Sequence, residues 1–402
     1  MKKLLLLGGS RYLLPVINAA HKLGIYVITC DYLPNNIAHR FSDEYRNVSI
    51  IEKDEILTLA QQLKVDGIMS FACDPGVETA AYVAEKMGLP SCGSYASVCI
   101  LQNKEKFRSF LKKNGFNVPE AKGYLAVDDA MKDVALFHWP VIVKPVDSAG
   151  SKGVTRIDCP EDLPQAAEYA MGFSKTNRFI VEEFIEKKGN SSDTDCFSVD
   201  GKLVFASFSN QYFDETAENP YTPAAYSWPS DMSAQGQAEL RSELQRLIDL
   251  LQLGTSIYNV ETREGTNGKA YIMEVSPRGG GNRLAELLGY ATNTDLVTNA
   301  VRAAVGEPVI GIQHDPVYNG SWAEVILHAD TSGTFSHLRI DPEFEKKYVF
   351  EKDIWIEAGA PVHGFTGANE TIGTLILRFE DQAQLRSALR DIKRYVSVIV
   401  NK

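Results

Sequence analysis

The sequence has 402 residues, 44% of them hydrophobic and 23% charged, which is an ordinary globular composition and a length for roughly two to three domains. With 41 Lys and Arg against 52 Asp and Glu, the net charge is −11, so binding to a nucleic-acid backbone is disfavoured. An anionic ligand must therefore be held by a local basic cluster or a metal. No apolar stretch approaches the ~18 residues of a membrane span, so we expect no membrane partner.

The cysteines and the first residues bear on the compartment. The six cysteines form no CxxC pair and have no histidine at metal-ligand spacing, which indicates free thiols in a reducing compartment. The apolar run after Lys3 ends at Leu7, which is too short for the core of a signal peptide. We therefore expect a cytoplasmic protein.

The first 95 residues alternate between apolar strand patterns and amphipathic helix patterns. Strands are expected at 4–7, 25–30 and 67–71, with helices ending at 23 and spanning 54–62 and 76–87. This order predicts a doubly wound parallel α/β domain. Because Gly8-Gly9-Ser10-Arg11 lacks G-x-G-x-x-G spacing, a substrate-side wall or a structural role is favoured over a nicotinamide site with Asp31 on a ribose.

Two lysines lie where a bound anion would explain them. Lys104 is in the first turn of an amphipathic helix expected at 103–113, where the helix dipole disfavours a cation; a solvated side chain is the alternative. Lys144 is in an apolar strand at 139–145, and the Gly- and Ser-rich loop 147–153 after it suits a phosphate cradle. The loop is not a P-loop, because G-x-x-x-x-G-K-[ST] is absent.

Two pairs of acidic residues stand out in the next segment. The strand expected at 179–185 is apolar except for Glu182 and Glu183, which suits adenine recognition by backbone groups and one acid; solvated acids are the equal alternative. Asp193 and Asp195 follow in a Ser-rich loop. The pattern then predicts a hairpin at 197–207, a long functional loop at 210–232 and a helix at 237–251.

The stretch from Tyr258 to Arg283 organises the rest. Two strands, 258–263 and 270–275, flank Asn267-Gly268, which is the signal for a two-residue type I′ turn. A turn centred there sets Glu261 opposite Glu274 and Asn259 opposite Ser276. It also predicts a buried apolar face made of Tyr258, Val260, Tyr271, Met273 and Val275.

Two carboxylates directly opposite on one sheet face repel each other unless a cation lies between them. Oxygen ligands favour Mg²⁺, which takes its other ligands from water and phosphate. Arg278 and the glycine-rich residues 279–283 follow at once, and such a set suits charge that develops on a transferring phosphoryl group. The alternative is an edge hairpin with two solvated acids.

From about Asp315 the pattern changes to short strands and turns. Strands are expected at 323–327, 373–379 and 396–400, with a helix at 382–395. We therefore expect a small α+β domain at the end of the chain.

Taken in order, these pieces resemble the ATP-grasp superfamily, and within it carboxylate–amine ligases such as bacterial L-amino-acid ligases, carbamoyl-phosphate-synthase-like enzymes and purine-pathway enzymes. Glu261 with Glu274-Val-Ser-Pro-Arg278 is similar to the family's Glu…Glu-x-Asn-Pro-Arg metal motif. Asn103-Lys104, Lys144 with its loop, and residues 181–185 are similar to the family's helix start, phosphate strand and hinge. The resemblance implies a Rossmann-like pre-ATP-grasp domain at 1–100, an ATP-grasp domain at 101–312 with a flap at about 124–187, and a C-terminal α+β domain at 313–402.

The resemblance also implies roles for individual residues. It implies that Lys104 and Lys144 contact the phosphates of ATP, and that the loop closes over these phosphates through Ser148, Gly150, Ser151 and Gly153. It implies that Glu182 and the backbone of Glu183 and Ile185 hold the adenine. Asp193 would bind the ribose. It implies Mg²⁺, or Mn²⁺ in its place, on Glu261, Glu274 and, through water, Ser276, which is shorter than the family's Asn. Arg278 would stabilise the transition states. The substrate pocket would be lined by Gly280, Gly281, Asn282 and Arg283, with Arg283 either on a substrate carboxylate or in a surface salt bridge.

The expected function is an ATP- and Mg²⁺-dependent ligase that activates a carboxylate as an acyl phosphate and joins it to an amine, releasing ADP and phosphate. A biotin-dependent carboxylase is disfavoured because no Met-Lys-Met carrier motif is present. A non-catalytic nucleotide-binding protein and a nicotinamide-dependent enzyme are further alternatives. The expected partners are a small-molecule carboxylate and amine, with a homodimer expected on general frequency alone.

Overall fold

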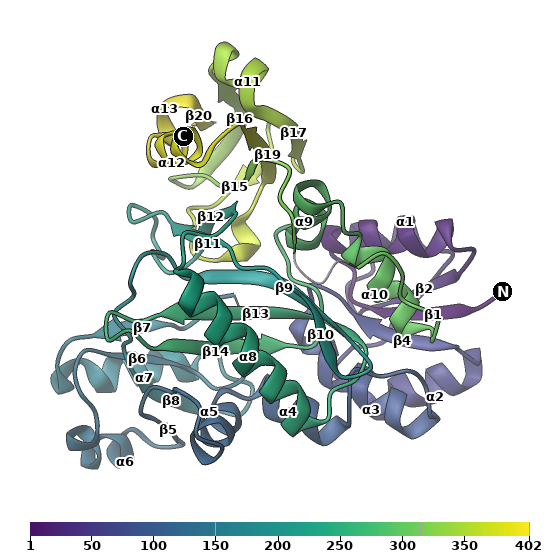
Figure 1. Ribbon diagram of the computed structural model, residues 1–402, viewed down its shortest axis with the longest axis horizontal. Helices are drawn as coiled ribbons and strands as arrows, with labels where there is room; N and C mark the ends of the chain where they lie inside the picture. Colours follow the sequence, from purple (N-terminus) through teal and green to yellow (C-terminus); the bar gives the residue numbers. More distant parts are fainter. Residues whose placement is uncertain (149, 313–315, 402) are drawn as a thin grey trace.

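The computed structural model describes residues 1–148, 150–312 and 316–401. Its first part is a four-stranded parallel sheet in the order β3-β2-β1-β4 with helices on its faces (Figure 1). The strands are apolar because helices cover them, and Leu4 to Leu7 are fully buried. The predicted α/β alternation is confirmed, although the short strand β3 was missed. The elements are β1 (Lys3–Leu7), α1 (Leu14–Lys22), β2 (Tyr26–Cys30), β3 (Glu44–Arg46), α2 (Lys53–Leu63), β4 (Gly67–Ser70) and α3 (Val77–Met87).

Two later helices, α9 (Leu284–Thr292) and α10 (Leu296–Ala304), return to this first sheet. Leu287 and Leu288 of α9 share one core cluster with Leu4 and Leu6 of β1. The approach of α10 to β4 is so close that a Cβ on Gly67 would lie 2.1 Å from the Ala304 carbonyl oxygen. Two helices from far along the sequence therefore pack against the first sheet.

The central sheet has the antiparallel order β10-β9-β13-β14. The helix α8 (Ala234–Leu251) covers one face of it, where Leu240 and Leu244 pack against Tyr258 and Val260. The side chain of Ser233 accepts a hydrogen bond from Gly236 N and starts α8 three residues before the predicted position. The strands are β9 (Ser192–Val199), β10 (Lys202–Ala206), β13 (Ser256–Glu264) and β14 (Ala270–Ser276).

The pairing of Glu261 and Asn259 with residues of β14 is as predicted, but the loop of the hairpin β13–β14 differs from the predicted one. Glu261 is opposite Glu274, and Asn259 is opposite Ser276. The predicted two-residue turn is wrong, because Gly265 N bonds to Lys269 O and leaves a three-residue loop at 266–268. A β-bulge between Glu261 and Thr262 restores the register.

The bulge also changes which residues face α8. Beyond it, Ala270 and Ile272 enter the core under α8, with Tyr258, Val260 and Val275. Tyr271 and Met273 are buried, but they are outside this cluster, so that part of the predicted face is wrong.

The flap sheet has the antiparallel order β5-β8-β6-β7. Val141 and Val143 pack under α7 on one face, while Ile142, Lys144, Ile180 and Glu182 share the other. The elements around this sheet, with the two helices before it, are α4 (Tyr95–Gln102), α5 (Lys104–Lys113), β5 (Ala121–Tyr124), α6 (Val127–Lys132), β6 (Val141–Pro145), β7 (Thr155–Ile157), α7 (Leu163–Met171) and β8 (Phe179–Glu183).

A buried ion cluster joins the flap sheet to the central sheet. Arg108 of α5 donates from Nε to Glu182 Oε2 of β8 at 2.6 Å and from Nη1 to the Met273 carbonyl of β14 at 2.7 Å. Lys144 Nζ donates to the other oxygen of Glu182 at 2.9 Å. Burial would raise the pKa of Glu182, but Arg108 and Lys144 outweigh it and lower the pKa from 4.5 to about 2.

The last part contains two sheets, β11-β12-β15-β19-β17 and β18-β16-β20. The expectation of a loop at 210–232 is wrong in part, because β11 and β12 form strands there and β12 pairs with β15. The helix expected at 382–395 is two helices. The elements are β11 (Asn210–Phe213), β12 (Pro223–Trp228), β15 (Ser321–Leu327), β16 (Gly333–Ile340), α11 (Pro342–Tyr348), β17 (Val349–Ile354), β18 (Pro361–Val362), β19 (Gly373–Phe379), α12 (Gln382–Arg390), α13 (Ile392–Tyr395) and β20 (Val396–Asn401).

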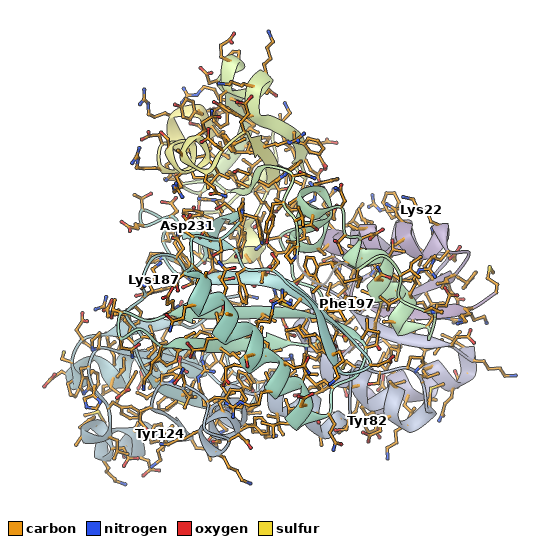
Figure 2. All side chains as sticks on the ribbon, viewed as in Figure 1. Lys22, Tyr82, Tyr124, Lys187, Phe197 and Asp231 are labelled. Atoms are coloured by element: carbon orange, nitrogen blue, oxygen red, sulfur yellow. The ribbon has the colours of Figure 1, made fainter. Side chains whose placement is uncertain are left out.

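The division into three domains stays a prediction. The expected change of pattern at Asp315 lies outside the described residues, and the five-stranded sheet draws strands from both sides of the expected boundary at 312. Figure 2 places Tyr124 of the flap and Lys22 of α1 at opposite sides of the molecule, with Phe197 of β9 between them. Among the helices described, none is both long enough and apolar enough to cross a bilayer.

We predict that Gly67→Ala destabilises the protein by about 2 kcal/mol, because the new methyl group overlaps the backbone of α10 and forces it away from β4. Urea unfolding measures the change. The matched control is Gly172→Ala, whose Cβ meets its nearest neighbour at an ordinary 3.4 Å. Equal stability of the two variants would contradict the close packing of α10 on β4.

We predict that Glu182 makes part of the stability depend on acid pH. Its folded pKa lies below its ordinary value, so between pH 4.5 and 2 the unfolded chain binds more protons and stability falls as the pH falls. About 2 kcal/mol of its contribution is lost between pH 5 and pH 3. Glu182→Gln is less stable overall, but it does not show this loss of stability between pH 5 and pH 3. Urea unfolding at the two pH values measures the free energy of unfolding of each protein. The exposed control Glu120→Gln should lose as much stability between pH 5 and pH 3 as the wild type. An unchanged pH dependence of stability in Glu182→Gln would contradict the role of the buried cluster.

Candidate active site

The predicted acid pair lies side by side on the face of β13 and β14. The side chains of Glu261 and Glu274 are 35% and 34% exposed. Lys104 Nζ lies 3.4 Å from Glu274 Oε2, and Arg263 Nη2 lies 3.9 Å from Glu261 Oε1. Burial raises the pKa of Glu261, and the Glu274 carboxylate adds to this. Two acids that repel each other at a half-exposed position fit a divalent cation with phosphate and water as its other ligands.

Ser276, the third expected metal ligand, is engaged by protein groups. Its hydroxyl donates to Asp74 Oδ1 at 3.0 Å and accepts from Gln102 Nε2 at 2.8 Å, and the residue is buried. Sequence reasoning missed both partners. Asp74 had a usable signal, since it follows the carboxyl end of the parallel strand β4, where open α/β sheets place ligand-binding residues.

Arg278 is fixed from the first sheet. Its Nε and Nη2 donate to the two carboxylate oxygens of Asp74 at 3.0 and 2.7 Å. Burial would raise the pKa of Asp74, but Arg278 outweighs it and holds the pKa below its usual range. The guanidinium is thus a pre-oriented cation whose place depends on the N-terminal part of the chain.

The hinge residues have partners of their own. Both oxygens of Glu182 are bonded to Arg108 and Lys144, so an adenine amine would compete with two cations for this acid. The N–H of Glu183 donates to the Glu120 carbonyl, and the Ile185 carbonyl accepts from Arg263 Nη1 at 3.2 Å. Burial and the neighbouring Arg108 and Lys104 lower the pKa of Lys144 against the pull of Glu182.

The loop after β6 lies across the site. Lys104 Nζ donates to the Ser148 carbonyl at 2.9 Å, so one ammonium contacts both this loop and Glu274. At its far side, Ser151 Oγ donates to the Tyr221 carbonyl at 2.9 Å, and Asn219 Nδ2 donates to the Ser151 carbonyl at 3.2 Å. Gly150, Ser151 and Gly153 have left-handed backbone, with φ of 71°, 58° and 70°. Position 149 of this predicted cradle lies outside the described residues.

Two aspartates lie on β9 beside the acid pair, Asp195 fully buried and Asp193 partly buried. Asp193, expected to bind ribose, is opposite Glu261 and accepts from Asn259 Nδ2 at 2.8 Å and Tyr226 Oη at 3.1 Å. Asp195 Oδ1 accepts from the N–H of Gly280 at 2.8 Å. Burial raises the pKa of each to about 7, with Glu261 adding to the shift of Asp193.

The predicted substrate residues 280–283 begin beside Asn259 and Asp195. A side chain on Gly280 would meet Leu284 at 2.7 Å and Asn259 at 2.8 Å, so only glycine fits there, while Gly281 has room for one. Asn282 and Arg283 both have left-handed backbone, at φ 51° and 56°, a strain typical of functional segments.

Arg283 is buried and paired within the protein. Its guanidinium bonds to Glu351 Oε1 at 2.6 Å and to Glu286 Oε1 at 3.1 Å, and its side chain is 8% exposed. The alternative of a salt bridge is therefore confirmed, although the Arg283 side chain is buried rather than at the surface. A substrate carboxylate on Arg283 stays a prediction.

A second group of metal-ligand types was not predicted. Asp214, His328 and Asp330 lie close enough together to hold a cation. Lys393 Nζ already fills that position, 2.8 Å from Asp214 and 2.9 Å from Asp330. This cluster is therefore an ion pair that ties α13 to the chain after β11.

Comparisons with known proteins agree with this geometry. Residues 137–286 match the family model described as the ATP-grasp domain. The formate-dependent phosphoribosylglycinamide formyltransferase of Synechococcus sp. (strain CC9605) is 29% identical over 192 residues, 46% of this chain and 47% of that protein. The carbamoyl phosphate synthase large chain of Clostridium botulinum (strain Langeland / NCTC 10281 / Type F) is 23% identical over 313 residues, 75% of this chain and 28% of that protein. The chain thus spans about half or less of the length of these two curated relatives.

The fold extends beyond the matched domain. The crystal structure of an L-amino acid ligase from Bacillus licheniformis superposes with a TM-score of 0.82 at 19% identity and covers 100% of this chain and 99% of that one. The expected fold and the resemblance stated from the sequence motifs are confirmed. The chain therefore contains an ATP-grasp domain at its centre and has the fold of the ATP-grasp ligases over its whole length.

Proposed function

We propose that this protein is an ATP- and Mg²⁺-dependent ligase that joins a carboxylate to an amine through an acyl phosphate. One observation carries the proposal: the ammonium of Lys104 contacts both the acid pair, through Glu274, and the loop that suits phosphate, through Ser148. A metal site, a cation and a glycine-rich loop that meet in this way suit phosphoryl transfer, where positioning and charge stabilisation do most of the work.

Within this proposal, Glu261 and Glu274 hold the divalent ion, and Ser276 supports the site through Asp74 and Gln102. A bound Mg²⁺ would neutralise phosphate charge and polarise the phosphoryl oxygens. Mn²⁺, which also accepts oxygen ligands, is expected to replace it. Lys104 and Lys144 supply positive charge to the phosphates, and the loop containing Ser148, Gly150, Ser151 and Gly153 shields them from water.

The remaining roles follow from the same arrangement. The backbone at Glu183 and Ile185 is proposed to contact adenine, and Asp193 the ribose. Arg278, fixed by Asp74, is oriented to stabilise negative charge on the reacting carboxylate and phosphate. In the second step the amine nitrogen bonds to the acyl carbon, the bond from that carbon to the phosphate oxygen breaks, and the amine loses a proton.

The similarity to an L-amino acid ligase favours this function over the alternatives. A biotin-dependent carboxylase has no support from the sequence, which lacks a carrier motif. A nicotinamide site at Asp31 is disfavoured because the carboxylate already accepts from Tyr32 N and Asn36 Nδ2. The six free cysteines are consistent with a cytoplasmic protein, and a homodimer remains an expectation.

We predict that Glu261→Gln and Glu274→Gln each lower Mg²⁺-dependent ADP release at least about 100-fold, because an amide is a poorer ligand for a hard cation and a metal-bound charge contributes several kcal/mol. ADP release from Mg²⁺-ATP is measured with pools of small carboxylates and amines. The control is Glu168→Gln, an exposed change on α7. Full turnover by either variant would show that the acid pair does not hold the metal.

A further inference from the structure

Arg263 of β13 lies between the acid pair and the hinge at 181–185. Asn259, Glu261 and Arg263 are alternate residues of this strand, so their side chains extend from the same face. Asn259 contacts the aspartate that binds the N–H of Gly280, Glu261 belongs to the acid pair, and Arg263 contacts the hinge. This face therefore leads from the glycine-rich residues, past the proposed metal site, to the segment proposed to hold adenine.

Two nitrogens of the Arg263 guanidinium are held by protein oxygens. Nε donates to Ser191 Oγ at 3.2 Å, and Nη1 donates to the Ile185 carbonyl at 3.2 Å. Nη2 lies 3.9 Å from Glu261 Oε1, beyond hydrogen-bond distance, and it donates to no acceptor among the residues that the structure describes. The side chain is 17% exposed. Arg263 is therefore fixed in place and still has N–H groups on Nη2 to donate to a ligand.

A second cation lies beside Arg263. Lys187, labelled in Figure 2, forms no ion pair within the described part of the chain, and its backbone forms a β-bridge with Gly265 of the hairpin loop. Burial lowers the pKa of Lys187, Arg263 adds to this shift, and Glu215 opposes the two only in part. Two like charges that the backbone holds near each other would be stabilised by an anion.

The flap sheet faces Arg263. Glu182 and Arg156 are both paired with Ile142 of β6, so their side chains share one face of the flap sheet, and the buried ion cluster ties this face to β14. The ring of Phe184 lies between two guanidinium groups, 4.7 Å from that of Arg156 and 5.9 Å from that of Arg263. Arg263 is thus on the side of β13 where the nucleotide is proposed to lie.

The position of Arg263 favours one part of ATP. The hinge is proposed to hold adenine, and the acid pair is proposed to hold the metal with the terminal phosphates. The groups between these two ends are the ribose and the α-phosphate. A ribose hydroxyl is neutral, whereas a phosphate oxygen forms a charge-assisted hydrogen bond with a guanidinium. The α-phosphate is therefore the better match for Nη2.

We propose that Arg263 binds the α-phosphate of ATP through Nη2, while Ser191 and Ile185 hold its guanidinium in place. The bound phosphate would also reduce the repulsion between Arg263 and Lys187. The inference rests on the proposed ligase function and adds to it a nucleotide contact from outside the sequence motifs.

The test uses the intact protein without divalent metal and two probes, adenosine and adenosine 5′-monophosphate, which differ only in the α-phosphate. In calorimetry, Arg263→Gln should lower the affinity for the monophosphate at least about tenfold and the affinity for adenosine less than about twofold, because only the charge-assisted contact is lost. The control Lys269→Gln removes the same charge from an exposed position on the same hairpin and should alter neither affinity.

Arg263→Lys keeps the positive charge but loses the planar fork, so it should lower the affinity for the monophosphate about threefold and leave that for adenosine unchanged. This variant carries the test if Arg263→Gln does not fold. Wild-type affinity for the monophosphate in the variants would overturn the assignment. An equal loss of affinity for both probes would also overturn it, because Arg263 would then only brace the hinge.

Binding of the monophosphate needs neither a metal nor a carboxylate, so it is independent of ligase activity. ADP release with pooled carboxylates and amines tests the ligase proposal separately. If monophosphate binding depends on Arg263 but no pool supports ADP release, the nucleotide contact stands and the ligase function is wrong. If ADP release occurs but Arg263→Gln binds the monophosphate as the wild type does, only the role of Arg263 is wrong.

Discussion

The repulsion between Glu261 and Glu274 is the constraint on which the proposed site depends. A sheet does not hold two carboxylates face to face without a counter-charge, and the structure places Lys104 3.4 Å from Glu274 and Arg263 3.9 Å from Glu261. A bound metal ion would therefore explain why the two acids face each other, whereas the same pair on an ordinary surface would destabilise the sheet.

Distant segments of the chain hold this position in place. Asp74 of the first sheet orients Arg278, and α5 contributes Lys104 to the acid pair and Arg108 to the buried cluster. That cluster fixes the flap sheet against β14, while the loop after β6 reaches the carbonyl of Tyr221. The site thus includes residues from outside 137–286, the part of the chain that matches the ATP-grasp domain.

Short-range sequence patterns correctly predicted several of the helices and strands that carry the candidate site. The strands of the hairpin, the helix with Lys104 at its start, and the strand with Lys144 were predictable from periodicity and capping. The facing of the two glutamates was also predicted, although the three-residue loop and the bulge offset each other in a way that the sequence did not indicate. The bulge is also the reason why the prediction of the apolar face was wrong beyond Glu261.

Contacts between distant residues were not predictable in this way. No sequence pattern linked Arg108, in the helix expected at 103–113, to Glu182, and only the fold brings it to this residue, 74 positions later. The strands β11 and β12 looked like a loop because β15, with which β12 pairs, begins almost a hundred residues further on. Arg283 was expected at a surface or on a substrate, and its partner Glu351 lies in a strand that sequence reasoning had missed.

The most direct test of the central claim follows the oxygen atoms of the carboxylate substrate. If an acyl phosphate forms, one labelled oxygen of an ¹⁸O-carboxylate must pass to inorganic phosphate in each turnover, because the amine displaces the phosphate from carbon. Mass spectrometry of the phosphate released with Mg²⁺-ATP and an amine should therefore show one ¹⁸O per molecule. Unlabelled phosphate, formed at the same rate as the amide, would contradict the account.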